Sequence, residues 1–278
     1  MEYALSNKDL QKIELNIAKE IKRICEKNSI SYFIVGGTLL GAVRHSGFIP
    51  WDDDMDIGMT YENYCKFLSA AKVDLQDMYI LQEWNDGSDY GYPFAKVKLK
   101  GTCVVEKVSR NININRGVWV DIFPYIQVPK RKAKSKMFMF VLQMLSKSFL
   151  LKLGYDLNCL TENVFSRILN FFLKNIPLSE KWLSNKFMRL LLTSSNKEEN
   201  DFYIECDGMF KGNFVFPKNY FDNTVNLKFE DTFFSAPHMY KEYLSDAYGD
   251  YLTPPPLCER NKGHSIISVT TLENNKDQ

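Results

Sequence analysis

Three features are scarce in this chain of 278 residues, and each scarcity excludes a class of protein. The six cysteines form no CxxC pair, and with only three histidines they offer little for a zinc site. No apolar run reaches the roughly 20 residues that span a bilayer, and the N-terminus has no apolar signal-peptide core. We therefore expect reduced thiols and a cytoplasmic protein rather than an exported, disulfide-bonded one.

Charge is nearly balanced overall but unevenly distributed. The net charge is +1, yet the span 130–190 carries twelve Lys or Arg against three Asp or Glu, so the remainder is acidic. The same span contains two strongly apolar runs, 137–151 and 164–173, which indicate helices. Such a segment fits either a cap on the core or amphipathic helices at a membrane interface. We expect a cap that also makes peripheral contact with an anionic membrane, on its inner face, and no nucleic-acid partner.

The segment that carries most of the chemistry covers 35–59 and reads VGGTLLGAVRHSGFIPWDDDMDIGM. Its four aspartates within five positions repel one another, and a divalent cation relieves that repulsion. Hard oxygen ligands suit Mg²⁺, with Mn²⁺ as a substitute. Because apolar residues alternate with Asp54 and Asp56, the pattern predicts a strand that turns both carboxylates toward one ion. A solvated acidic turn is the alternative interpretation.

A third carboxylate, Asp121, lies in the middle of the strand-like run GVWVDIFPY (117–125). An isolated carboxylate in a buried strand is destabilising unless it is paired or binds a metal, although an edge strand would leave Asp121 in water. We predict that Asp54, Asp56 and Asp121 hold one or two Mg²⁺ ions and are the catalytic residues. Asp121 is also the candidate to take a proton from an attacking hydroxyl.

Other residues around the acidic segment suit an anionic substrate. Gly36 and Gly37 let the backbone approach a phosphate, and the helix start at Thr38 adds N–H donors. Arg44 and Lys96 are candidates to neutralise a diphosphate.

Three further candidates contact substrate in this interpretation. His45 follows Arg44 inside the same segment, a few residues from the aspartates. Asp250 lies in the run YLSDAYGDYLTPPP, which we expect to close over the donor, and His264 follows it. A lone histidine is more often a surface or core residue, so the two histidines remain open between these readings.

The predicted elements follow the order of the nucleotidyltransferase fold. Helices are expected at 7–26, 38–44, 61–71 and 237–248, with Pro237 opening the last, and strands at 31–35, 54–59, 79–84, 94–105, 117–125, 224–229 and 232–236. The expected class is α+β: a mixed sheet flanked by helices, with a helical insertion and a C-terminal α/β extension. The corresponding domains are a catalytic core at 1–129, a basic helical cap at 130–200, and an extension at 201–278 that completes the active site. The tail from 261 to 278 is polar enough to fray.

The segments GTLLGAVRHSGFIPWDDDMDIGM, GVWVDIFP and YLSDAYGDYLTPPP, followed by Arg260 and His264, resemble the LicD family of phosphotransferases. That family includes bacterial phosphocholine transferases and is similar in its core to the fukutin-related proteins. The resemblance implies transfer of a phospho-alcohol, typically phosphocholine from CDP-choline, to a sugar hydroxyl. The acceptor it implies is a cell-surface glycan precursor (teichoic acid, lipopolysaccharide or capsule), carried on a lipid, and the released product is CMP.

Several alternatives stay open at the level of the sequence. The same chemistry is compatible with CDP-ribitol or CDP-glycerol as donor, because donor choice depends on pocket shape. Nucleotidyl transfer from ATP or CTP would use the same carboxylates, although the basic apolar span favours a lipid-linked acceptor. A binding protein without activity would have no reason to retain three mutually repelling carboxylates. In a glycosyltransferase with a DxD motif, the acidic pair usually follows a full nucleotide-binding half.

Overall fold

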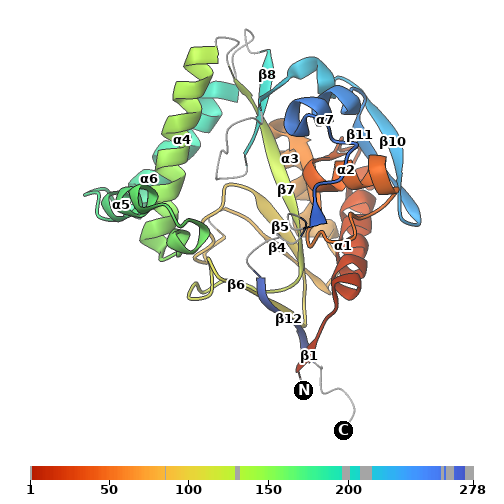
Figure 1. The fold of residues 1–278 in the computed structure, drawn as a ribbon, viewed down its shortest axis with the longest axis horizontal. Helices are drawn as coiled ribbons and strands as arrows, with labels where there is room; N and C mark the ends of the chain where they lie inside the picture. The colour runs from red at the N-terminus through yellow and green to blue at the C-terminus, as the bar shows by residue number, and fades with distance from the viewer. Residues whose placement is uncertain are drawn as a thin grey trace.

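In the computed structural model, helices pack around a mixed sheet, which confirms the predicted α+β class (Figure 1). The structure describes residues 2–84, 86–128, 132–195, 201–206, 215–257, 260 and 266–272. The helices are α1 (Asn7–Lys27), α2 (Gly36–His45), α3 (Tyr61–Asp74), α4 (Lys132–Leu153), α5 (Val164–Lys174), α6 (Glu180–Ser195) and α7 (Tyr240–Tyr248), with 3₁₀ turns η1 (Leu157–Leu160) and η2 (Lys218–Phe221). The strands are β1 (Glu2–Ala4), β2 (Phe33–Ile34), β3 (Asp56–Thr60), β4 (Tyr79–Gln82), β5 (Ala95–Leu99), β6 (Thr102–Glu106), β7 (Trp119–Val128), β8 (Phe202–Glu205), β9 (Val215–Pro217), β10 (Thr224–Phe229), β11 (Thr232–Pro237) and β12 (Ile266–Leu272).

Strand β7 is the centre of the main sheet, whose order is β2-β3-β7-β5-β4 with β8 and β9 continuing from β7. It pairs in parallel with β3 along one edge and antiparallel with β5 and then β8 along the other. Nearly every residue of β7 is buried, as expected for a strand covered on both faces. This central position makes any polar side chain on β7 an interior group.

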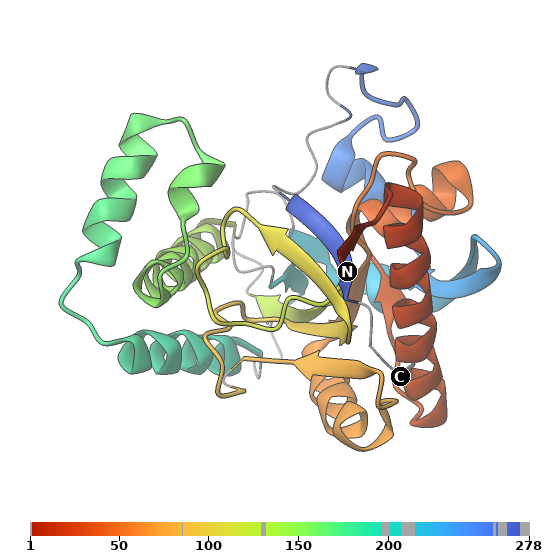
Figure 2. The ribbon, with the colours of Figure 1, turned by 90° about the horizontal axis from the view of Figure 1, so that it is seen from below.

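The flanking helices form two groups, one on each side of β7 in the two views (Figures 1 and 2). Helix α1 begins at a capping box between Ser6 and Asp9 and buries an apolar stripe that includes Ile17 and Ile21. On the other side, α4 and α6 pack on the far ends of β7 and β8 through a second apolar cluster that contains Leu142 and Phe187. Among the described residues, no helix combines the length and the apolar character needed to cross a bilayer.

Four expected elements differ from the structure. The acidic strand begins only at Asp56, so Asp54 lies in the preceding loop and the two do not share a strand face. The span 94–105 is two strands, β5 and β6, that turn at Gly101 (φ +77°) and belong to different sheets. Pro237 ends β11 instead of opening a helix, and α7 starts at Tyr240. In the tail, β12 pairs with β1 and β6 in a three-stranded sheet instead of fraying.

Candidate active site

Three of the predicted residues form a row across neighbouring strands of the main sheet. Asp56 on β3 is in register with Asp121 on β7, and Asp121 is in register with Lys96 on β5. Lys96 Nζ lies 2.9 Å from Asp121 Oδ1 in a salt bridge whose side chains are only 7% and 11% exposed. Trp119 Nε1–H donates to the other oxygen, Oδ2, at 3.2 Å, and its ring lies 3.9 Å from Lys96 Nζ. The interior carboxylate predicted from the sequence is therefore both buried and paired.

Burial and neighbouring negative charges destabilise the ionised form of the Asp56 carboxyl group. Its pKa is raised well above the ordinary value of 3.8, first by burial and then by the negative charges of Asp54 and Asp121. Glu205 and Asp52 add smaller contributions of the same sign. Asp56 and Asp121 thus lie opposite each other on neighbouring strands, and the charge of Asp54 acts on Asp56 from the preceding loop.

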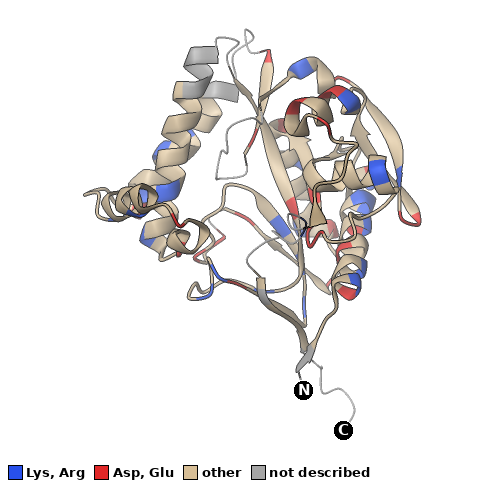
Figure 3. Ribbon diagram, viewed as in Figure 1, with Lys and Arg blue, Asp and Glu red and all other residues tan. Residues whose placement is uncertain are grey.

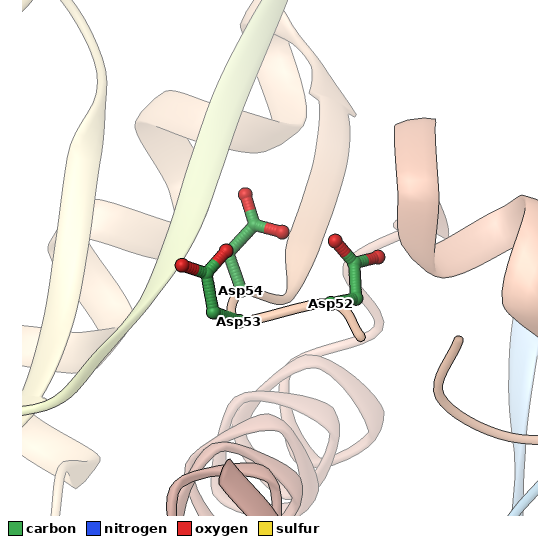
Figure 4. Close-up of side chains that lie close together, drawn as sticks. All are labelled: Asp52, Asp53 and Asp54. Atoms are coloured by element: carbon green, nitrogen blue, oxygen red, sulfur yellow. The ribbon is translucent and has the colours of Figure 1, made fainter. Parts of the chain in front are cut away.

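The loop before β3 brings a second set of carboxylates together (Figure 4). One oxygen each from Asp52, Asp53 and Asp54 lies within 4.8 Å of the others, and all three side chains are half-buried. The backbone of this loop is held by α1, because the side-chain amides of Asn7 and Gln11 both donate to the carbonyl of Asp52 at 3.0 Å. The loop shape that gathers the aspartates is thus fixed by the first turns of α1.

The two glycines at the start of α2 allow this helix to approach the carboxylates. Gly36 has φ +56°, and a Cβ added to it would lie 3.0 Å from Asp56 Oδ2. A Cβ added to Gly37 would lie 2.7 Å from Asp52 Oδ2. Thr38 is buried, and its hydroxyl accepts the N–H of Asp56 at 2.8 Å, which orients the start of β3.

Arg44, at the end of α2, belongs to a small cationic and aromatic group. The Arg44 guanidinium lies 6.0 Å and the Arg260 guanidinium 4.6 Å from the centre of the Trp51 ring. Arg44 Nη1 also donates to the carbonyl of Tyr251 at 3.2 Å. Burial and the positive charge of Arg260 lower the pKa of Arg44, so the two guanidinium groups repel each other. Two adjacent arginines beside Asp52 suit an anion with more than one phosphate.

The remaining predicted contacts fall at the edge of this group or outside the described residues. His45 is exposed, and its ring meets the Trp51 ring edge-on at 6.2 Å. Burial and the charge of Arg44 lower the pKa of His45. Asp250 is exposed, and its carboxylate accepts the N–H of Thr253 at 3.4 Å, so it stabilises the loop after α7. His264 lies outside the described residues.

Glu14 on α1 is a sixth acid of the site, and the sequence reasoning missed it. Its side chain is 2% exposed, and its Oε2 atom has no hydrogen-bond partner among the residues that the structure describes. Burial and then the charges of Asp54 and Asp53 raise its pKa well above the ordinary value. Within α1, Glu14 continues the stripe of Asn7 and Gln11 along one helix face, which places it beneath the acidic loop.

Other interior polar side chains lie on the strands and the helix around the site. The Tyr125 hydroxyl donates to Glu205 and lies 3.4 Å from the Tyr243 hydroxyl, which in turn accepts the N–H of Gly36 at 3.3 Å. These hydrogen bonds connect Tyr243 of α7 to Gly36 at the start of α2. Lys98, two residues from Lys96 on β5, is 2% exposed, and its pKa falls to about 7 because of burial and the nearby Lys96 charge. In the sequence, the alternation of lysines over 96–100 is the one feature that singles out Lys98.

The donor set fits a hard divalent cation. It consists of carboxylate oxygens only, several of them mutually destabilising, and the buried Glu14 oxygen adds an unpaired acceptor. Binding of a divalent cation would offset the repulsion that, after burial, raises the pKa of Asp56.

Comparison with known proteins finds a family match for the part of the chain that holds these carboxylates. Residues 29–154, which contain the whole carboxylate row, match the family described as LicD/FKTN/FKRP, nucleotidyltransferase domain. The chain carries a LicD-family domain. This confirms the resemblance predicted from the sequence segments.

Relatives of the LicD-family domain support this assignment at two scales. The lipopolysaccharide cholinephosphotransferase LicD of Haemophilus influenzae is 29% identical over 282 residues, which cover 96% of this chain and 99% of that protein. The ribitol 5-phosphate transferase FKRP of human and mouse is 39% identical over 58 residues, 20% of this chain and 12% of each relative. The full-length similarity confirms the prediction of a LicD-like phosphotransferase.

Proposed function

We propose that this protein catalyses the Mg²⁺-dependent transfer of a phospho-alcohol, phosphocholine from CDP-choline, to a sugar hydroxyl of a cell-surface glycan precursor, with release of CMP. The observation that carries the proposal is the row Asp56–Asp121–Lys96 beside the Asp52–Asp54 loop. The nearly full-length similarity to a cholinephosphotransferase supports the donor, and the family description supports a nucleotidyltransferase fold.

The proposed metal ligands are Asp54, Asp56 and Asp121, for one or two Mg²⁺ ions or for Mn²⁺ in their place. When bound, the ion supplies positive charge that neutralises the phosphates of the donor and stabilises the leaving phosphate. Lys96 holds the Asp121 carboxylate in place through the buried salt bridge, while Thr38 holds the backbone of Asp56.

In the proposed reaction, the oxygen of a sugar hydroxyl attacks the phosphorus atom that bears choline. The bond from that phosphorus to the oxygen of CMP breaks, so phosphocholine moves to the sugar and CMP leaves. The hydroxyl proton passes to a carboxylate of the row, with Asp121 as the proposed acceptor. Arg44 and Arg260 are the proposed ligands of the donor diphosphate, and the closeness of both guanidinium groups to the Trp51 ring, at 6.0 and 4.6 Å, supports this role.

A second donor, CDP-ribitol, is favoured by the similarity of one 58-residue segment to the ribitol 5-phosphate transferase FKRP. The chemistry and the proposed ligands are unchanged in this case, because only the alcohol carried by the phosphorus differs. The short length of the match makes CDP-choline the first choice.

We also propose the arrangement in which this reaction takes place. The core at 1–129 holds the carboxylates, the helical cap at 130–200 meets an anionic membrane that carries a lipid-linked acceptor, and 201–278 completes the site. The hydrogen bond from Gly36 to Tyr243, and the Arg260 contact with Trp51, support a role for the C-terminal part in the site.

A thermal-shift series tests the donor and the site together. The purified protein is melted with Mg²⁺ and CDP-choline, CDP-ribitol, CDP-glycerol, CTP or ATP. A ligand at 100 times its Kd stabilises the folded state by about 2.7 kcal/mol. We expect CDP-choline to raise the melting temperature most, the effect to vanish in Asp54→Ala, and the exposed matched control Asp77→Ala to keep it. Stabilisation by ATP or CTP but by no CDP-alcohol would contradict the proposal.

A further inference from the structure

Helix α5 presents an unusual concentration of apolar side chains to solvent. Phe165 is 82% exposed, Phe172 66% and Phe171 65%, all within an 11-residue helix. Val164, Ile168 and Leu169 are exposed beside them. Helices of globular proteins turn such residues to the core, and contiguous exposed apolar patches mark interaction surfaces.

The orientation of α5 is reversed relative to an ordinary surface helix. At 3.6 residues per turn, the polar residues Ser166 and Asn170 lie on one side and the phenylalanines on the opposite side. The buried residue is Asn170, whose side-chain amide donates to Asn158 Oδ1 at 3.0 Å. The helix is attached to η1 and α4 through Asn170 and through Leu173, which packs on the apolar cluster around Leu150, while its phenylalanines face outward.

Helix α5 is also well placed to meet a large surface. In both ribbon views it lies at the outer edge of the molecule, beyond α4 and away from the central sheet (Figures 1 and 2). Trp182 on the following helix, α6, is 45% exposed as well and presents an aromatic ring with a polar N–H to solvent. Amphipathic aromatic side chains of this kind are favoured at the boundary between water and lipid.

The charge around α5 selects the partner. Between 137 and 193 there are seven Lys or Arg and three Asp or Glu, and blue segments recur along α4 to α6 in Figure 3. Arg167 and Lys174 lie on α5 itself and are exposed. Positive charge beside an outward apolar face is the pattern of interfacial helices on anionic lipid. A second copy of this chain on the same face would instead bring like charges together.

We propose that the outward face of α5 inserts into the interface of an anionic membrane, with Phe165, Phe171 and Phe172 among the acyl chains and Arg167 and Lys174 at the headgroups. This proposal rests on the proposed function in one respect: the proposed function explains why the protein would bind a membrane, where a lipid-linked acceptor is found. Its test is independent of any turnover.

The experiment compares binding to sedimented vesicles for the unmodified protein and two double variants. Phe165→Ser with Phe172→Ser removes the outward face, and Val73→Ser with Phe233→Ser changes residues that are also exposed (83% and 56%) but lie on α3 and β11. Because all four side chains are exposed, folding should persist, and circular dichroism verifies it. The vesicles contain phosphatidylcholine, either alone or with one third phosphatidylglycerol.

We expect the unmodified protein and the Val73/Phe233 variant to bind the anionic vesicles equally, and the Phe165/Phe172 variant to bind about tenfold or more weakly. Binding to phosphatidylcholine alone should be much weaker for all three. Equal binding by the Phe165/Phe172 variant would overturn the proposal, as would a concentration-dependent dimer that this variant dissociates. A normal donor-induced thermal shift in the same variant separates failure of membrane binding from failure of the proposed function.

Discussion

Replacement of Lys96 by methionine should strongly destabilise the protein when divalent ions are absent. The salt bridge to Asp121 is almost completely buried, with side chains 7% and 11% exposed. Removal of one partner from such a pair typically costs about 3–5 kcal/mol, because the other charge stays in the interior without compensation. Of the two partners that the described residues give Asp121, only the Trp119 N–H would then remain, and Asp56 in the neighbouring strand would repel the carboxylate.

The assay is urea unfolding in EDTA, read by circular dichroism, for Lys96→Met, Asp121→Asn and the double variant. The double variant should recover much of the stability lost in Lys96→Met, since the uncompensated charge is gone. Added Mg²⁺ should lessen the loss in Lys96→Met, since a bound cation would compensate Asp121. As a control, Lys19→Met removes an exposed salt bridge to Asp231 and should matter far less. A loss below about 1 kcal/mol for Lys96→Met, or no recovery in the double variant, would refute this reasoning.

Three further outcomes follow from the same geometry. In EDTA, Asp56→Asn should melt above the unmodified protein by a margin that grows as pH rises past 3.8, because a raised pKa means that ionisation of Asp56 opposes folding. Between pH 7 and 10.5, the stability of the unmodified protein relative to Lys98→Met should increase, since the folded state releases the Lys98 proton first; equal pH profiles in urea unfolding would contradict this. Gly36→Ala should lower donor affinity and melting temperature more than Gly87→Ala, which has a similarly positive φ but no neighbour within 4 Å; calorimetry and thermal melts compare them.

The candidate carboxylates could be predicted because charged side chains are unfavourable in an apolar strand or next to other charges of the same sign. A carboxylate inside the apolar run 117–125 must be paired or bound, and clustered aspartates repel one another, so Asp121, Asp54 and Asp56 are identifiable from the sequence. The strand register that places Asp121 beside Asp56 and Lys96 could not be predicted from the sequence, because it depends on which strands pair in the folded sheet.

Other features of the fold and the site could not be predicted from the sequence, because they depend on how distant segments pack together. Glu14 lies in an amphipathic helix, where a glutamate ordinarily belongs to the solvated face, and only the packing of α1 under the acidic loop buries it. The pattern of 164–173 predicted the α5 helix but not that its apolar side points outward, because periodicity defines a face and not its partner. Strand β12 was missed since its pairing partners, β1 and β6, are distant in sequence.

The measurement that tests the central claim most directly is the identity of the product formed from CDP-choline. Chromatography with mass detection follows the nucleotide with Mg²⁺ or EDTA, in the presence of sugar acceptors, for the unmodified protein, Asp121→Asn and Asp77→Ala. The account predicts CMP and a phosphocholine ester in the presence of Mg²⁺, retained in Asp77→Ala and lost in EDTA and in Asp121→Asn. Release of pyrophosphate from CTP or ATP with CDP-choline left intact, or normal CMP release by Asp121→Asn, would contradict it.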